Sequence, residues 1–244
     1  MPYVVAPPPT VSIPIRASTE RFPVRRVYCV GRNYAAHARE MGFDPDREPP
    51  FFFCKPADAV RPVAEGQTLE LAYPAQTSDY QHEIELVAAI GTGGSAIEVE
   101  RALEHVWGYA VGLDMTRRDL QLQMRKAGRP WEIGKAFDDS APIGPLVPAA
   151  QVGNLQAAAI RLEVNGSTRQ SSTIGQLIWS VAETVSYLSR YFRLEPGDLI
   201  YTGTPEGVGP VVAGDLLVGA VDGVGTLRVK VLAAGQGGGS GAAG

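Results

Sequence analysis

Short apolar runs separated by glycine and proline dominate the chain, and this pattern predicts a β-rich domain. The runs Val27–Val30 and Phe51–Cys54 have the length and the boundaries of buried strands. Residues 80–90 begin with apolar and acidic positions in alternation, which predicts another strand, closed by the glycine-rich turn at 91–94. Further short strands are expected at 199–201, 216–218 and 226–232.

Helical periodicity or helix-forming composition marks four segments. They are residues 33–41, 97–107, 114–126 and 175–192. Within the third, Thr116 and Asp119 have the spacing of a capping box. Many short strands with a few helices predict an α+β, β-rich fold rather than a regular alternation of strand and helix. The glycines match neither a dinucleotide-binding nor a P-loop pattern, so we predict no nucleotide site.

The two ends of the chain differ from its middle. Residues 1–25 contain six prolines and little periodicity, so we expect an extended N-terminal arm. Residues 26–232 are predicted to form a single domain. The glycine-rich residues 233–244 are predicted to form a flexible tail.

Composition narrows the function. The chain has 244 residues, of which 45% are hydrophobic, and its 26 acidic residues outnumber 22 basic ones, which argues against a nucleic-acid partner held by a basic face. The sequence contains no membrane-length apolar run and no signal-peptide pattern, so a membrane partner is not expected. Two cysteines in apolar runs suggest buried thiols and a cytoplasmic location. With only three histidines, any chemistry must rely largely on carboxylates.

The strongest chemical signal is the pair Glu83 and Glu85. On a strand these alternate residues share a face, with Cα atoms roughly 6–7 Å apart, while Ile84 and Leu86 face the core. Two converging carboxylates suit a hard divalent cation such as Mg²⁺ or Mn²⁺. An ordinary exposed strand face is the alternative interpretation.

Asp114 ends an apolar run and could join these carboxylates, although it could equally be a helix N-cap. Arg118 and Gln121 follow it at helical spacing, where a guanidinium and an amide could hold a substrate carboxylate beside a cation. The alternative for Arg118 is a solvated helix cation.

His37 is the best candidate for a general base. Glu40 lies three residues further along the predicted helix at 33–41, where it could fix the tautomer of the imidazole and raise its basicity. A surface contact is the alternative. His82 alternates away from the acidic pair and is assigned a structural or supporting role, and His105 receives no functional assignment.

Two further features could bind anions. Lys135 lies within a mostly apolar run, and a buried lysine needs a carboxylate or another anion, although a lysine reaching to the surface is the alternative. The segment Thr202–Gly209, which includes Thr204, is a tight loop after a strand, and its backbone N–H groups and hydroxyls could hold an anion.

Six segments that occur in order along residues 27–232 resemble those of one protein family. They are Val30–His37, Phe53–Pro56, His82–Leu86, Gly112–Asp119, Gly134–Phe137 and Thr202–Gly209. Each segment is weak evidence alone, but all six together are similar to the fumarylacetoacetate hydrolase family. The proline-rich start and residues 51–60 are most similar to bacterial members that cleave fumarylpyruvate in gentisate degradation.

This resemblance implies a mixed β-sandwich roll with a few helices, in a homodimer. It implies a catalytic domain over 26–232 with Mg²⁺ or Mn²⁺ held by Glu83, Glu85 and Asp114. His37 and Glu40 would activate water from a short mobile lid helix near 33–41. The pyruvoyl end of the substrate, a small 2,4-dioxo acid, would be held by Lys135, Arg118, Gln121 and Thr204.

The expected reaction is carbon–carbon bond hydrolysis of an acylpyruvate, with fumarylpyruvate giving fumarate and pyruvate. Decarboxylation of oxaloacetate or isomerisation of an oxo-dienoate is the alternative on the same site, because enolate stabilisation alone does not choose among these outcomes. A base for water activation favours hydrolysis. A non-catalytic protein that binds a metal or a carboxylate is the remaining alternative.

Overall fold

The computed structural model describes residues 2–40 and 48–236, and its largest element is a sheet of eight strands. Seven strands follow the order β4-β3-β15-β8-β9-β11-β5, and β12 pairs with β9. The strands are β3 (Val27–Gly31), β4 (Phe51–Lys55), β5 (Val60–Pro62), β8 (Ile84–Ile90), β9 (Val106–Leu113), β11 (Ala141–Ile143), β12 (Val147–Pro148) and β15 (Leu199–Tyr201).

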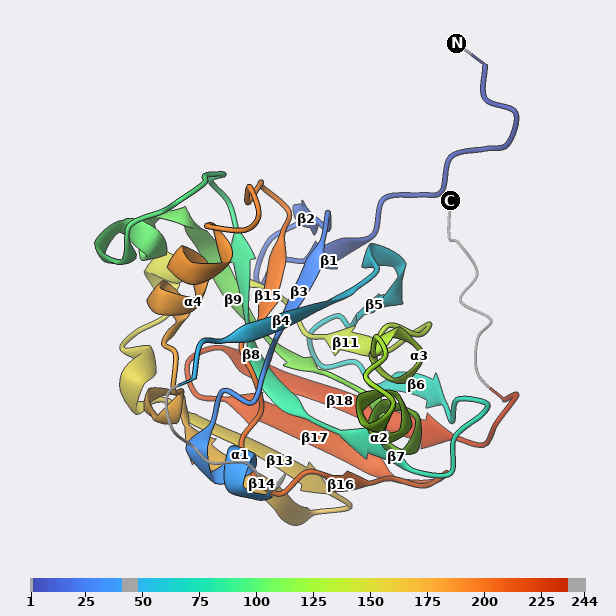
Figure 1. The fold of residues 1–244 in the computed structure, drawn as a ribbon. Coiled ribbons are helices and arrows are strands. Elements are labelled where there is room, and N and C mark those ends of the chain that lie inside the picture. The colour runs from blue at the N-terminus through green and yellow to red at the C-terminus, as the bar shows by residue number, and fades with distance from the viewer. Residues whose placement is uncertain (1, 41–47, 237–244) are drawn as a thin grey trace.

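A second sheet of five strands packs against the first, in the order β14-β13-β17-β18-β6 (Figure 1). Its strands are β6 (Leu69–Ala72), β13 (Ala159–Val164), β14 (Ser167–Thr173), β17 (Leu216–Val221) and β18 (Gly225–Leu232). In Figure 1 these long strands run below β8 and β9, which gives the β-rich sandwich roll that was predicted.

The predicted strand over 80–90 is divided between two sheets. Residues 80–82 form β7 (Tyr80–His82), the middle strand of a small sheet with β10 (Thr116–Arg117) and β16 (Gly209–Pro210). The chain then enters the large sheet at β8, so Glu83 lies at the junction of the two sheets. The first carboxylate of the acidic pair is thereby placed just before the start of a central strand of the large sheet.

Four α-helices and five short 3₁₀ segments complete the described fold. The α-helices are α1 (Ala35–Glu40), α2 (Arg118–Lys126), α3 (Glu132–Lys135) and α4 (Val181–Leu188). The 3₁₀ segments are η1 (Ala57–Ala59), η2 (Val99–His105), η3 (Ala149–Gln151), η4 (Leu155–Ala157) and η5 (Ile174–Gln176). None of the helices in the described ranges has the length and apolarity to cross a membrane.

None of the four predicted helices has the expected extent. The helix over 97–107 is instead the 3₁₀ segment η2, because Val106 already begins the buried strand β9. The helix over 175–192 is reduced to α4, which starts where Ser180 and Glu183 form a capping box. The predicted lid helix over 33–41 corresponds to α1, which spans Ala35–Glu40. Met41 lies outside the described residues.

The proposed capping box of Thr116 and Asp119 is wrong. Thr116 pairs with Gln81 in the small sheet, so α2 begins only at Arg118. The Thr116 hydroxyl donates to the Asp114 carbonyl at 3.0 Å, and the Asp119 carboxylate accepts from the Ser78 N–H at 2.9 Å. Asp114 is therefore a strand-end residue and not a helix cap.

The large sheet is buried on both faces. In β3, Tyr28 and Val30 point into the core between the two sheets, whereas Val27 and Cys29 point into a second core on the other face. The same alternation holds along β8, where Ile84 and Leu86 face the first core, as predicted. Continuous burial on both faces makes β8 and β9 a rigid platform for side chains at their ends.

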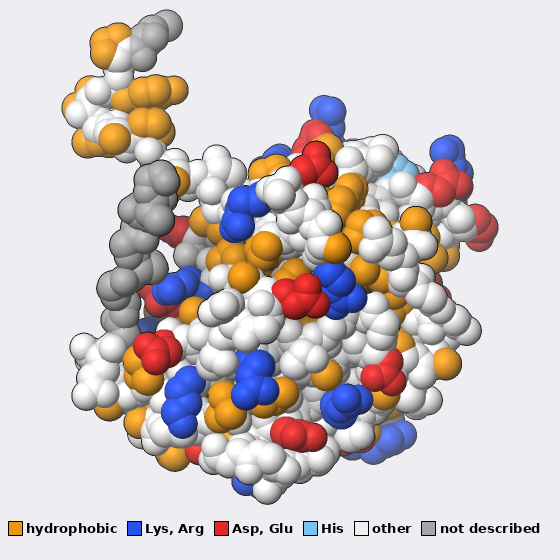
Figure 2. Space-filling model, turned by 180° about the vertical axis from the view of Figure 1, so that it is seen from behind, with side chains coloured by type: hydrophobic (Ala, Val, Ile, Leu, Met, Phe, Trp, Pro, Cys, Tyr) orange, Lys and Arg blue, Asp and Glu red, His pale blue; other side chains and the backbone are white. Residues whose placement is uncertain are grey.

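The predicted N-terminal arm is partly folded. Residues 2–10 extend away from the body (Figures 1 and 2). In contrast, β1 (Ser12–Pro14) and β2 (Arg21–Pro23) form an antiparallel pair that covers the second core of the large sheet, which we call the outer core. Ile13 is fully buried, and the Phe22 ring lies 5.5 Å from the Trp107 ring. The reason is the hydrophobic gain from covering an otherwise exposed apolar sheet face.

Charges are mixed on the face shown in Figure 2, where acidic and basic side chains alternate over the surface. Of the two cysteines, Cys29 is buried as predicted. Cys54 is exposed, contrary to the prediction, because β4 is the edge strand of the large sheet.

We predict that Phe22→Ala lowers the free energy of unfolding by about 3–5 kcal/mol, because it empties a well-packed site in the outer core. The control Val5→Ala lies in the exposed part of the same predicted arm and should change stability by less than about 0.5 kcal/mol. Urea denaturation of both variants measures the difference. Equal stabilities for the two variants would show that the β1–β2 pair does not belong to the folded core.

Candidate active site

A cavity of about 130 Å³ opens where the ends of β8 and β9 meet the first turn of α2. Eight of the nine side chains expected at an active site line it: His37, Glu83, Glu85, Asp114, Arg118, Gln121, Lys135 and Thr204. The ninth, Glu40, contacts His37. Residues that are distant in the sequence are thus brought to one place by the sheet topology.

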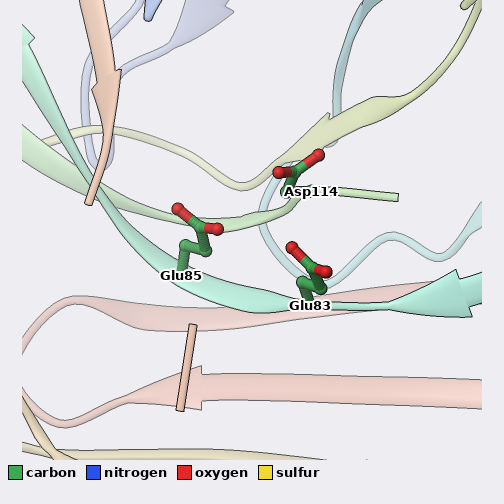
Figure 3. Close-up of side chains that lie close together, drawn as sticks. All are labelled: Glu83, Glu85 and Asp114. Atoms are coloured by element: carbon green, nitrogen blue, oxygen red, sulfur yellow. The ribbon is translucent and has the colours of Figure 1, made fainter. Parts of the chain in front are cut away.

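Three carboxylates converge at the base of the cavity. Glu83, Glu85 and Asp114 are buried, and each offers an oxygen within 4.8 Å of those of the others. Glu83 and Glu85 rise from the start of β8, and Asp114 follows the end of β9 (Figure 3). The Asp114 N–H donates to the Glu83 carbonyl at 2.8 Å, which fixes the two residues opposite each other. The interpretation of Glu83 and Glu85 as an exposed strand face is excluded.

Two buried lysines neutralise part of this acidic group. The Lys135 ammonium lies 2.7 Å from one oxygen of Glu83 and 2.7 Å from one oxygen of Asp114, and it also donates to the Thr116 hydroxyl at 2.7 Å. The other oxygen of Asp114 lies 2.8 Å from the Lys55 ammonium. The expectation that a lysine in an apolar run requires carboxylates is confirmed for Lys135.

The electrostatic balance differs among the carboxylates. Burial opposes ionisation of Glu83, but the charges of Lys135 and Arg118 outweigh it and hold the pKa of Glu83 well below its usual range. Burial raises the pKa of Glu85, and the charges of Asp114 and Glu83 raise it further against one hydrogen bond from the Gly203 N–H at 2.7 Å. Glu85 is therefore the carboxylate whose charge is least compensated by the protein.

This donor set fits a hard divalent cation. All three candidate ligands are carboxylates, the ligand type that Mg²⁺ and Mn²⁺ prefer. Asp114 Oδ1 is buried and accepts no hydrogen bond from the described residues, since its contact with Lys55 lacks hydrogen-bond geometry. A cation here would satisfy this oxygen and compensate the charge on Glu85.

Arg118 and Gln121 lie on the cavity-facing side of α2, although not through helical spacing from Asp114, which precedes the helix. The Arg118 guanidinium donates to Glu83, to the Gln81 amide oxygen at 2.8 Å and to the Gln121 amide oxygen at 2.5 Å. Both side chains are buried, so Arg118 is not a solvated helix cation. Its hydrogen bonds hold the guanidinium beside the carboxylates.

His37 and Glu40 are in contact, as their spacing predicts. His37 Nδ1 lies 3.2 Å from a carboxylate oxygen of Glu40, and His37 is buried at the cavity wall. Glu40 also accepts a hydrogen bond from the Gly207 N–H at 3.2 Å. The contact with Glu40 leaves Nε2 of the imidazole as the nitrogen available for a proton from the cavity.

The loop over 202–209 does hold anions, as its glycines suggest, and these anions are the protein's own side chains. Its N–H groups bind the carboxylates of Glu85, through Gly203, and of Glu40, through Gly207. Gly203 has a φ of 99°, and a Cβ there would lie 2.6 Å from the Asn33 side chain. The loop therefore links a candidate metal ligand to the histidine–glutamate pair.

Gln170 is a supporting residue that the sequence did not reveal. Its fully buried amide group donates to the Thr204 hydroxyl at 2.8 Å and accepts from the Ile84 N–H at 3.1 Å. The same amide oxygen lies 3.0 Å from His82 Nδ1, which gives His82 the structural role assigned to it. Burial lowers the pKa of His82. Gln170 thus fixes Thr204 relative to the start of β8.

Lys55 is the second residue that sequence reasoning missed. It follows an apolar strand and is as buried as Lys135, so the argument used for Lys135 applies to it equally. Gln170 carried no comparable signal, because a single glutamine in a polar strand is ordinary.

Comparison with known proteins agrees with this geometry. The family described as "Fumarylacetoacetate (FAA) hydrolase C-terminal" matches residues 26–232. The chain belongs to the fumarylacetoacetate hydrolase family. The prediction made from the six sequence segments is confirmed.

Three relatives illustrate the range of activities in the family. A fumarylpyruvate hydrolase from a Ralstonia species is 48% identical over 188 residues, which are 77% of this chain and 95% of the relative. The crystal structure of fumarylpyruvate hydrolase from Pseudomonas aeruginosa, in complex with Mn²⁺ and pyruvate, is 71% identical with a TM-score of 0.94, covering 95% of this chain and 100% of that chain. An oxaloacetate tautomerase from Escherichia coli is 41% identical over 212 residues, covering 86% and 94% of the two chains.

We predict that Glu85→Gln weakens Mn²⁺ binding at least about 100-fold, because it removes a candidate ligand from a set of three. Without metal, the variant should be at least as stable as the wild type, because it removes a buried charge close to two like charges. Calorimetric titration with Mn²⁺, together with thermal melts in its presence and absence, measures both effects.

Glu132→Gln is the matched control, because Glu132 is an exposed acid on α3 outside the cluster. The Glu132→Gln variant should be stabilised by Mn²⁺ against thermal unfolding as much as the wild type. If the Glu85→Gln variant bound Mn²⁺ with wild-type affinity, Glu85 would not be a metal ligand.

Proposed function

We propose that the protein is a metal-dependent hydrolase that cleaves the carbon–carbon bond of an acylpyruvate, with fumarylpyruvate as the main substrate and fumarate and pyruvate as products. One observation carries the proposal: a histidine that is paired with a glutamate lines a cavity that also holds three converging carboxylates. The similarity to fumarylpyruvate hydrolases supports the same reaction.

The inner part of the cavity would bind the pyruvoyl end of the substrate. Arg118 and Gln121 offer a guanidinium and an amide for its carboxylate, and the Thr204 hydroxyl, held by Gln170, lies on the same wall. Mg²⁺ or Mn²⁺, held by Glu83, Glu85 and Asp114, would supply a Lewis acid for the carboxylate and 2-oxo oxygens.

His37 is the proposed general base. It takes a proton from a water molecule that attacks the 4-carbonyl carbon, and Glu40 orients the imidazole and stabilises its charged form. The bond between C3 and C4 then breaks, the acyl part leaves as a carboxylic acid, and C3 and its electron pair become a pyruvate enolate. Lys135 stabilises the negative charge of this enolate, which takes up a proton to give pyruvate.

The arrangement also supports a second candidate, isomerisation or decarboxylation of a related oxo acid such as oxaloacetate. The similarity to an oxaloacetate tautomerase favours it. These reactions need enolate stabilisation but no attack by water, so the histidine–glutamate pair favours hydrolysis. A protein that only binds a metal or a carboxylate would have no use for this pair.

Three further points belong to the same proposal. Mg²⁺ serves as well as Mn²⁺, because the two ions share their preference for oxygen ligands.

The protein forms a homodimer in the cytoplasm. The helix α1 acts as a short lid that carries His37. Both cysteines are free thiols, which suits a reducing compartment. The exposed Tyr191 and Phe192 that follow α4 offer an apolar contact surface for a second subunit.

We expect the purified protein to hydrolyse fumarylpyruvate in the presence of Mg²⁺ or Mn²⁺, and to lose this activity in EDTA, because the buried carboxylates cannot replace a Lewis acid. A panel of fumarylpyruvate, acetylpyruvate and oxaloacetate, each assayed with each metal, measures the preference. Rapid conversion of oxaloacetate without hydrolysis of either acylpyruvate would select the second candidate. Turnover that persists in EDTA would contradict the metal assignment.

His37→Ala should lower kcat for fumarylpyruvate by about 10²- to 10⁴-fold, and Glu40→Gln should lower it by a smaller factor, because the base is lost or misoriented. Mn²⁺ affinity should stay within about threefold of the wild-type value, since neither residue belongs to the acidic cluster. His105→Ala is the control, since the His105 imidazole contacts the Thr92 carbonyl outside the cavity. Wild-type turnover by His37→Ala would end the proposal of a histidine base.

A further inference from the structure

One strand of the second sheet carries a single buried residue, Gln170, and this residue reaches the active site from behind. The other side chains of the edge strand β14 are exposed or half-buried, whereas Gln170 is fully buried. A buried amide group needs hydrogen-bond partners for its oxygen and for its nitrogen. Gln170 has both, and the arrangement of these partners carries information about the neighbouring cavity.

A β-bulge lies next to Gln170 in β14. The strands β13 and β14 pair Leu162 with Gln170 and Glu163 with Thr168, which leaves Arg169 as an extra residue in β14. A bulge bends its strand and re-aims the adjacent side chains, and bulges are common next to active sites. The position of the bulge explains why a glutamine in a polar edge strand is turned inward.

The loop over 202–209 packs directly on this bulge. A Cβ at Gly207 would overlap with the Arg169 carbonyl, and Gly207 has a φ of 88°, so the close approach requires glycine. From below the loop, Gln170 donates to the Thr204 hydroxyl at 2.8 Å and to the Pro205 carbonyl at 2.7 Å. The amide is thereby held against the hydroxyl that lines the cavity.

Two backbone groups determine which way the Gln170 amide points. Its oxygen accepts from the Ile84 N–H at 3.1 Å, and its nitrogen donates to the Pro205 carbonyl at 2.7 Å. A backbone N–H can only donate and a carbonyl can only accept. The reversed amide would place a donor against a donor and an acceptor against an acceptor, so one orientation alone satisfies both partners.

This orientation also determines the role of the Thr204 hydroxyl. The amide nitrogen of Gln170 has two protons, of which one goes to the Pro205 carbonyl and the other to the Thr204 oxygen. Thr204 therefore accepts in this contact, and its own proton must point elsewhere. Within residues 2–40 and 48–236 the Thr204 hydroxyl donates to no protein group, and Thr204 is buried at the cavity wall. The proton is thus available to a ligand in the cavity.

His82 extends the same arrangement by one group. Its Nδ1 lies 3.0 Å from the Gln170 amide oxygen, which has no proton to donate, so the imidazole carries a proton on Nδ1. His82, Gln170 and Thr204 then form a chain in which each group donates to the next and the last donates into the cavity. Hydrogen bonds in such a chain polarise one another, which strengthens the last donor.

We propose that Gln170 is a positioning residue that makes the Thr204 hydroxyl an obligatory hydrogen-bond donor to the oxygens of the pyruvoyl end. This inference rests on the proposed function, because it takes that end of the substrate as the ligand. Gln170 does not line the cavity and acts only through Thr204. A donor whose direction is fixed before binding does not have to reorient when the anion arrives.

The first test reverses the polarity of the Gln170 side chain. In Gln170→Glu, a carboxylate of the same shape accepts from the Thr204 hydroxyl and turns its proton away from the cavity. At saturating Mn²⁺, pyruvate should bind this variant about tenfold or more weakly than the wild type, as expected for a lost charge-assisted hydrogen bond. Calorimetric titration with pyruvate measures the affinity without turnover.

Gln170→Met separates the polarity of the side chain from its structural role. This variant leaves the Ile84 N–H and the Pro205 carbonyl without their partner, so it should unfold at a lower urea concentration than the wild type. The Thr204 hydroxyl stays free to donate into the cavity, so pyruvate affinity should remain within about threefold of the wild-type value. Equal losses of affinity in Gln170→Met and Gln170→Glu, or wild-type affinity in Gln170→Glu, would overturn the proposal.

Thr204→Val separates the polarity from the added charge. It should itself weaken pyruvate binding about tenfold, and Gln170→Glu added to it should cost less than about a further twofold, because no hydroxyl remains to be turned. A further tenfold loss in the double variant would assign the effect to charge repulsion and refute the proposal. Gln151→Glu, the same substitution at an exposed position outside the cavity, is the matched control and should keep wild-type affinity within about twofold.

The last test needs no variant of Gln170 to fold. Nitrogen-15 chemical shifts of the metal-free wild type should show His82 with a proton on Nδ1, and His37→Ala and His105→Ala identify the signals of the other two imidazoles. A His82 imidazole protonated on Nε2 alone would contradict the orientation of the Gln170 amide. A protein that passes these tests but hydrolyses no acylpyruvate would contradict the proposed function and leave the role of Gln170 in pyruvate binding intact.

Discussion

Mutual neutralisation of six buried ionisable groups is the constraint on which the rest of the site depends. Glu83 and Asp114 lie within hydrogen-bonding or ion-pair distance of three cations, Lys55, Lys135 and Arg118, and Glu85 beside them accepts a hydrogen bond from the Gly203 N–H. A buried charge without a partner costs several kcal/mol, so the loss of one member exposes the others to that cost. The double-sided burial of β8 and β9 holds their geometry, and the hydrogen bond between Asp114 and Glu83 sets the register at which the carboxylates meet.

Charge balance also connects the site to its substrate. The formal charges of the three carboxylates and three cations of this group sum to zero, so a divalent cation adds two positive charges to it. An acylpyruvate with a second carboxylate carries two negative charges and restores the balance, whereas a neutral acyl group leaves one positive charge uncompensated. The two negative charges of fumarylpyruvate, the proposed substrate, therefore agree with the formal charge of this buried group.

The sequence predicts best what is local. Glu83 and Glu85 alternate on one strand, and His37 and Glu40 are one helical turn apart, so these pairs follow from spacing alone. Contacts between distant segments cannot be predicted from local spacing. Gln170 forms hydrogen bonds with Thr204 and Ile84 only because two sheets pack together. Long-range contacts also explain why two predicted helices are shorter or absent. The Asn33 side chain accepts a hydrogen bond from the Trp179 N–H just before the start of α4, and the apolar run that begins at Val106 joins the large sheet.

The site divides into two parts that are built differently. The charged group is carried by the strands β4, β8 and β9 and by the helices α2 and α3. His37, in contrast, belongs to the short helix α1, which is tied to the loop over 202–209 through Glu40 and Gly207. In the proposed mechanism, the first part stabilises an enolate and the second supplies a base for water. The hydrogen bond from Gly207 to Glu40 is then the point at which the two parts are joined, because the same loop also holds Glu85.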